Sequence, residues 1–439
     1  MHESKLVIDR YSIEKILPLY CAVIVYKNIY NYFVYLFPFL ESIWVLLYNA
    51  VTLMGLLLYI PLFLYVLMQN RKYKLLNPAI IIPLCVLVNI LFVFIETGNL
   101  SILSRSHLLS VANGTNDESG YYFSQINTWF GNISVVLMLS VFTTKIETIK
   151  KCIISSMVTL FIPSILMMIS HPEFLGVRQS SVEGSDVIFS GGLWNIGVMG
   201  FGSISWLGLA LYKDMTRRQK RIVLISVITF AFLGIAGLSR TLIMMLALSV
   251  CCYFLIARKD GRLISKVFLI VCAVAIFAVV ESDLISSIFL RFNNSTSGTQ
   301  NVRFLLWEAY LSHFDEVWLF GAPYGSVYNY YYDVSLGVAH FLPHSSVINF
   351  LVRFGLLCAL SYLVLIKRAF FTVRQSKNVS INQVACIRAG CVAYVSLAFI
   401  NQTGYAEPIF YVMFGLLLAY SQLMREEARQ EKYEGRNNN

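Results

Sequence analysis

The chain has 439 residues, of which 57% are hydrophobic and 13% are charged, and its mean hydropathy is +0.67. Soluble domains carry about a quarter charged residues, so this composition excludes an ordinary soluble enzyme. The 31 Phe, 26 Tyr and 6 Trp also exclude a disordered chain. A membrane span needs roughly 20 apolar residues. The sequence therefore predicts an all-α polytopic integral membrane protein.

Apolar windows predict about twelve transmembrane helices within a single transmembrane domain, 1–439. The first window is too long for a signal peptide, carries Lys27 and is followed by no small-residue cleavage site, so we expect it to be retained. No internal repeat is visible, which gives no support to an inverted-repeat transporter. The predicted spans are 16–40, 43–68, 78–98, 126–143, 152–170, 191–212, 222–238, 241–257, 266–285, 346–366, 384–402 and 408–424.

The net charge of +10 follows a topological pattern and does not form a nucleic-acid-binding stripe. If the N-terminus is cytoplasmic, 26 of the 34 basic residues fall in loops or tails on the cytoplasmic side. This is the positive-inside distribution. We therefore expect both termini in the cytoplasm and no nucleic-acid partner.

The nine Cys residues all lie in or at the ends of apolar runs, without a C-x-x-C pair. We interpret them as packing residues, because neither a disulfide framework nor a zinc site follows from this spacing.

Four outer segments remain: 99–125, 171–190, the connection Ser239–Arg240, and 286–345. The last is a large loop between the ninth and tenth spans. Its apolar residues recur at helical spacing, which predicts an amphipathic helix on the outer membrane surface. These apolar residues are Val302, Leu305, Leu306, Ala309 and Tyr310.

Known nucleotide and metal motifs are missing from the sequence: it has no Walker loop, G-x-G-x-x-G, H-E-x-x-H or D-x-D. We therefore expect no cofactor and no metal. No Asp or Glu lies in the middle of a predicted span, and this lowers the weight of an ion-coupled transporter.

Ser239 is placed to cap the helix that follows it, and Arg240 then lies in the first turn. Free backbone N–H groups, the positive helix end and a guanidinium would converge there on an anion. The alternative is an interfacial Arg that binds lipid phosphate.

Pro343 suits a first helical position, which would place His344 in the first turn of the tenth span. The positive helix end would keep the imidazole neutral and able to accept a proton. The alternative is a His hydrogen-bonded at the interface. His340 is separated from His344 by the break at Pro343, so the pair does not predict a metal site.

Arg178 lies in the 171–190 loop, and Arg303 begins the amphipathic segment. Each alone could be an ordinary surface residue, and Arg353 and Lys27, within predicted spans, could snorkel or form structural ion pairs. Several outer Arg residues together with a His suit transfer from a diphosphate leaving group. Guanidinium groups would neutralise the phosphate charge while a base activates a hydroxyl.

With these residues the chain resembles the O-antigen polymerase and O-antigen ligase superfamily of membrane glycosyltransferases. The matching residues are Arg303-x-x-x-Trp307, Gly321-Ala322-Pro323-Tyr324-Gly325, and His344-Ser345 followed by Leu351 and Gly355. Ser239-Arg240-Thr241 resembles the family's Arg-bearing turn, and Arg178 its Arg in the preceding outer loop. Ser345 departs from the family pattern, which often has Asn there.

The resemblance implies a metal-independent transfer at the periplasmic face of the bacterial inner membrane. Its donor and acceptor would be oligosaccharides linked to undecaprenyl diphosphate, and a chain-length regulator is an expected further partner. Arg178 and Arg240 would hold the donor diphosphate, Arg303 would assist, and His344 would activate or orient the acceptor hydroxyl, so that His344 and Arg240 are the expected catalytic residues. Tyr328, Tyr330, Tyr331 and Tyr332 could stack on sugar rings or anchor at the interface.

We favour O-antigen polymerase activity in lipopolysaccharide biosynthesis, because high divergence and a Tyr-rich loop suit a variable polysaccharide. Three alternatives stay open. They are an O-antigen ligase acting on lipid A-core, a lipid-linked oligosaccharide flippase or other transporter, and a structural membrane protein.

Overall fold

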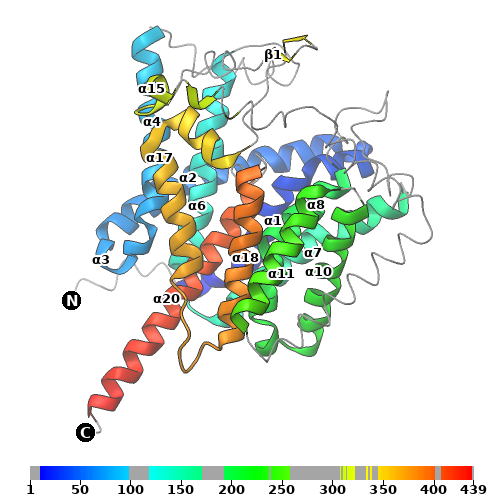
Figure 1. Cartoon of the computed structure of the whole chain (residues 1–439), viewed down its shortest axis with the longest axis vertical. Helices are drawn as coiled ribbons and strands as arrows, with labels where there is room; N and C mark the ends of the chain where they lie inside the picture. Colours follow the sequence, from blue (N-terminus) through cyan, green and yellow to red (C-terminus); the bar gives the residue numbers. More distant parts are fainter. Residues whose placement is uncertain are drawn as a thin grey trace.

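The apolar runs of the sequence form helices in the computed structural model, which Figure 1 shows as a bundle. The structure describes residues 10–97, 118–170, 192–236, 239–257, 307, 310–312, 314–321, 333–334, 337–338, 345–400 and 407–437. The α-helices are α1 Arg10–Leu36, α2 Glu41–Met68, α3 Asn70–Tyr73, α4 Asn77–Thr97, α6 Glu118–Phe142, α7 Ile146–Ser170, α8 Gly192–Gly200, α9 Trp206–Ala210, α10 Arg217–Ala236, α11 Arg240–Ala257, α15 Phe314–Val317, α17 Ser346–Phe371, α18 Ile381–Ile400 and α20 Pro408–Asn437.

Short elements complete the described part of the chain. Two strands, β1 Asp333–Val334 and β2 Gly337–Val338, pair antiparallel with Asp333 opposite Val338. Four single turns are η1 Pro38–Leu40, η2 Lys74–Leu76, η7 Phe201–Ser205, which is π-helical, and η8 Tyr212–Asp214.

Seven helices within the described residues are long and apolar enough to cross a membrane. They begin at Pro38, Lys74, Ile146, Arg217, Ser346, Ile381 and Pro408, and shorter apolar helices cover Ile126–Phe142, Asn195–Ala210 and Thr241–Ala257. The predicted all-helical polytopic fold is therefore confirmed. The predicted span 266–285 lies outside the described residues, as does most of the predicted amphipathic helix.

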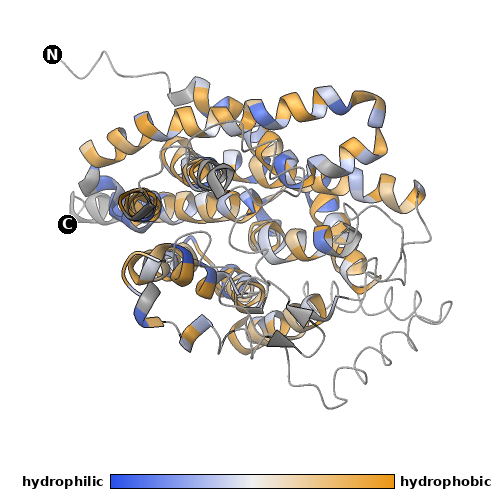
Figure 2. Cartoon of the chain, turned by 90° about the horizontal axis from the view of Figure 1, so that it is seen from above, coloured by the Kyte–Doolittle hydropathy of each residue, from blue (hydrophilic) through white to orange (hydrophobic). Residues whose placement is uncertain are grey.

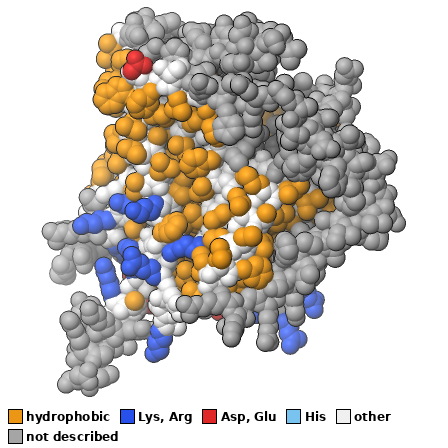
Figure 3. All heavy atoms as spheres, viewed as in Figure 1, with side chains coloured by type: hydrophobic (Ala, Val, Ile, Leu, Met, Phe, Trp, Pro, Cys, Tyr) orange, Lys and Arg blue, Asp and Glu red, His pale blue; other side chains and the backbone are white. Residues whose placement is uncertain are grey.

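The surface carries the polarity of a membrane protein. On α2, Leu46, Leu57 and Ile60 are more than 60% exposed, which is the pattern of a helix that faces lipid. Figure 3 shows hydrophobic side chains over a broad face, with Lys and Arg gathered on one side of it, toward the end where α20 projects. α15 and β1 lie at the opposite end (Figure 1). Seen from above, the helices are hydrophobic along much of their length (Figure 2).

The tenth predicted span is a broken helix and not a straight one. Gly355 has φ 82° and ψ 175°, so α17 consists of two helical halves on either side of it. The halves turn back toward each other, because the ring centroids of Phe350 and Tyr362 lie only 4.2 Å apart. Interrupted helices in membrane proteins occur where the backbone is buried in protein or lines a cavity.

Candidate functional site

The connection between α10 and α11 has the predicted cap. The backbone N–H of Leu242 donates to Ser239 Oγ at 3.2 Å, and the Ser239 N–H donates to the Gly234 carbonyl at 2.9 Å. These bonds satisfy orphan groups at the start of one helix and the end of the other. Arg240 is the first residue of α11, as predicted; its side chain lies outside the described residues.

The tenth predicted span, 346–366, begins at Ser346 as predicted, whereas the expectation that Pro343 and His344 form its first turn is wrong. Ser345 is extended, with φ −141° and ψ 125°, and α17 begins at Ser346. The Asn349 N–H donates to the Ser345 carbonyl at 2.9 Å in the first turn. The extended backbone of Ser345 separates Pro343 and His344 from this helix, and Ser345 Oγ makes no cap hydrogen bond. His344 therefore precedes the cap instead of lying in the first turn, and its own placement lies outside the described residues.

A buried polar row begins immediately after His344. Ser345, the N-cap residue of α17, and Asn349 and Arg353 within it are spaced four residues apart and are 1%, 0% and 5% exposed. Residues spaced four apart share one face of a helix. A polar face buried inside a membrane protein is expected where substrate or water enters.

Asn349 is the unusual member of this row. Neither its Nδ2 nor its Oδ1 has a hydrogen-bond partner among the described residues, and the same holds for Ser345 Oγ. Leaving a buried amide without a partner costs about 1–3 kcal/mol. Such groups in a native protein often serve a ligand or water. Asn349 thus places a buried carboxamide one turn beyond Ser345.

The first half of α17 is held by aromatic contacts and by a buried polar chain. The ring of Trp129, on α6, lies 4.7 Å from that of Phe350. Tyr362 hydrogen-bonds through its hydroxyl to the Tyr394 hydroxyl on α18 and also interacts with Ser346. These contacts join both halves of α17 to α18 and fix the direction of the polar row.

A second polar cluster, which the sequence analysis missed, joins α1 to the start of α20. Asn28 Nδ2 donates to Glu407 Oε2, and the Ile409 N–H donates to Asn28 Oδ1 at 3.0 Å. Lys27 attracts Glu407 electrostatically and lies 5.3 Å from the ring centroid of Tyr48. Lys27 and Glu407 therefore interact through their charges, but no salt bridge between them is found among the described residues. Glu407-Pro408 before an apolar run was the available signal, because a carboxylate favours a helix N-terminus.

The remaining predicted site residues, Arg178, Arg303 and His344, lie outside the described residues, as do Tyr328 and Tyr330–332. Two of the expected positions adjoin helix N-termini: Arg240 begins α11, and His344 precedes α17 by two residues in the sequence. Helix N-termini attract anions through free N–H groups and the helix dipole.

Residues 224–363 match the model of the family described as O-antigen ligase. The resemblance to the O-antigen ligase and polymerase superfamily is confirmed. The match runs from α10 to the second half of α17, so it includes Arg240, Arg303, His344 and the polar row, whereas Arg178 lies before it. No curated protein shows significant similarity to the chain. The family supports a membrane enzyme of the glycosyltransferase kind in lipopolysaccharide biosynthesis.

Proposed function

We propose that the protein is an O-antigen polymerase of the bacterial inner membrane. It would transfer a glycan from undecaprenyl diphosphate to the end of another lipid-linked repeat unit. The reaction would take place on the periplasmic side, and both chain termini would be cytoplasmic. The observation that carries the proposal is the family match at 224–363, because this segment holds the capped Arg240 turn and the polar helix that follows His344.

In this proposal the site divides into a diphosphate end and an acceptor end. Arg240, at the N-terminus of α11, would bind the donor diphosphate together with Arg178 and Arg303. Guanidinium groups form bidentate bonds to phosphate and would stabilise the charge that develops on the leaving group. This role requires no metal.

His344 would activate or orient the acceptor hydroxyl, and Asn349 would hydrogen-bond the sugar. A buried carboxamide offers two donors and an acceptor, which suits a hydroxyl-rich substrate. Asn349 has no partner among the described residues to compete for these groups.

The test is complementation of a strain that lacks this gene, with lipopolysaccharide resolved on a gel. Wild-type protein should give a ladder of lipopolysaccharide bands that differ in the number of repeat units. We expect His344→Ala and Arg240→Ala to give a core that carries a single repeat unit in place of this ladder. His313→Ala, in the same 286–345 loop, and Arg217→Ala, an exposed residue at the start of α10, are matched controls that should keep the ladder. A normal ladder from both site variants, at normal expression, would reject the mechanism.

The second candidate is an O-antigen ligase, which the description of the matching family favours. The same gel separates the two activities. A strain without ligase accumulates long lipid-linked chains beside unmodified core, whereas a strain without polymerase carries single repeats.

A further inference from the structure

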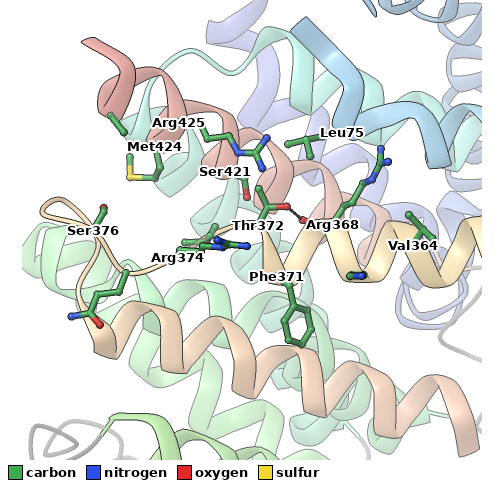
Figure 4. A pocket seen from close by; sticks show the side chains of 14 residues that line it. Leu75, Val364, Arg368, Phe371, Thr372, Arg374, Ser376, Ser421, Met424 and Arg425 are labelled. Atoms are coloured by element: carbon green, nitrogen blue, oxygen red, sulfur yellow. Dashed lines mark hydrogen bonds between the residues drawn. The ribbon is translucent and has the colours of Figure 1, made fainter. Parts of the chain in front are cut away.

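A cationic pocket lies near the opposite end of the molecule from α15 and β1, between α17, α20 and the loop after α17 (Figures 1 and 4). Its volume is about 710 Å³. Four cations line it: Lys367 and Arg368 from α17, Arg374 from the loop and Arg425 from α20. In Figure 4, Arg374 and Arg425 extend toward Thr372 from the loop and from α20. With Leu75 of η2, the pocket is built from four segments of the chain.

The charge of this pocket is not balanced by its own lining. None of the 14 described residues that line it is Asp or Glu. The nearby carboxylates have other contacts, since Glu426 pairs with Lys72 at 3.5 Å and Glu427 accepts a hydrogen bond from Asn378 at 3.3 Å. Arg368 and Arg425 also repel each other. An anion in the pocket would relieve this repulsion.

The pocket continues into an apolar track on the second half of α17. Leu357, Leu360 and Val364 are 58%, 47% and 38% exposed, and Phe371 beyond them is 50% exposed. Their spacing of three, four and seven residues keeps them on one helix face. Lys367 and Arg368 interrupt this face where it reaches the pocket. A soluble anion would leave this apolar surface uncovered, whereas the acyl chains of a lipid would cover it.

We propose that this pocket binds the phosphate headgroup of an anionic phospholipid, whose acyl chains lie along the apolar track of α17. Arg374, Arg425 and Lys367 are exposed and can turn toward the phosphate. Arg368 is partly engaged, because its Nη1 donates to the Lys74 carbonyl, and it contributes charge from a fixed position. Basic pockets between transmembrane helices are suited to anionic lipid headgroups. The bound lipid would join the end of α17 to the middle of α20.

The experiment uses the purified full-length protein in a neutral detergent. Binding of phosphatidylglycerol is measured by native mass spectrometry and by the shift in Tm. Phosphatidylcholine and inorganic phosphate are the comparison probes. The test variant is Arg374→Gln with Arg425→Gln. The matched control is Arg217→Gln with Arg218→Gln, which removes the same charge from exposed positions on α10.

We expect phosphatidylglycerol to bind the wild type and the control equally, and the test variant about 30-fold more weakly. This estimate follows from roughly a fivefold contribution by each cation to an anionic lipid. Lys367→Gln, expected to lose about fivefold, replaces the double variant if that protein does not fold. Equal weakening of the control variant would overturn the proposal in favour of unspecific charge attraction. A Tm shift with inorganic phosphate as large as that with phosphatidylglycerol would assign the pocket to a soluble anion.

Discussion

The carbonyl oxygen of Leu319 lies only 2.2 Å from the position that a Cβ atom at Gly355 would occupy. The contact is reciprocal, because a Cβ at Gly321 would lie 2.3 Å from the carbonyl oxygen of Arg353. Both glycines have positive φ, 79° at Gly321 and 82° at Gly355. The Leu356 N–H also donates to the Trp318 carbonyl at 2.7 Å. Two glycines from the family motifs thus let the segment after α15 cross the break in α17.

Gly355→Ala should destabilise the fold severely. Its φ and ψ lie in a region that is essentially restricted to Gly, which costs about 1–3 kcal/mol before the clash with Leu319 is added. Thermal unfolding in detergent should show a clear loss in Tm. Gly131→Ala, on α6, is the control: its Cβ would have no atom within 4 Å, and Ala favours a helix. An unchanged Tm for Gly355→Ala would contradict the broken helix.

Asn349→Leu should separate activity from stability. The change removes a buried amide that lacks a partner among the described residues, so Tm should stay equal or rise. Activity should fall at least tenfold if the carboxamide binds substrate. Asn89→Leu is the contrasting variant. Asn89 donates to the Phe320 carbonyl at 2.7 Å, and its loss should cost about 1–3 kcal/mol of stability. Full activity of Asn349→Leu would remove this residue from the site.

Ser239→Ala should reduce both stability and activity. Loss of the cap costs about 1 kcal/mol and loosens the first turn of α11, which carries Arg240. Ser380→Ala removes an equivalent cap on α18, where the Gln383 N–H donates to Ser380 Oγ at 3.3 Å. Ser380→Ala should lose a similar amount of stability but still support the full lipopolysaccharide ladder in the complementation assay. Equal ladders from the two variants would show that the α11 turn is not part of the site.

Glu14 should make stability depend on acid pH. Burial alone would raise the pKa of Glu14, but hydrogen bonds from Thr144 and Thr148 at 2.5–2.9 Å lower it below its ordinary value. The pKa of a Glu carboxyl in the unfolded chain is about 4.3. Because the pKa of Glu14 is lower in the folded state, its ionised carboxylate stabilises the protein at pH values above about 4.3. This contribution is lost as the pH falls through the folded-state pKa.

Glu14→Gln should therefore have a lower Tm than the wild type at pH 7. At pH 4 and below, the Tm of the variant should approach that of the wild type. Glu41→Gln, at the first residue of α2, is the control, because Glu41 is exposed and no hydrogen bond of its carboxylate is found among the described residues. A constant difference between Glu14→Gln and wild type across this range would contradict the ionised role of Glu14.

Local pattern was sufficient for much of this protein. Apolar runs predicted each described span because a helix of about 20 apolar residues satisfies its own backbone within lipid. Ser239 predicted its cap because the hydroxyl and the N–H it satisfies are three residues apart. The motif around Arg240 and His344 predicted the family, since it depends on residue order alone.

Only the tertiary structure decided the features that join distant residues. Gly355 breaks α17 because Leu319 crosses it, Glu407 has a partner because α20 begins beside Asn28, and the cations of the basic pocket come together only when α17 and α20 pack. Asn349 is a further example, because the sequence shows that an Asn is present but not that its side chain lacks a hydrogen-bond partner among the described residues. Hydropathy sums over neighbours in the chain, whereas burial, charge balance and backbone crossing depend on neighbours in space.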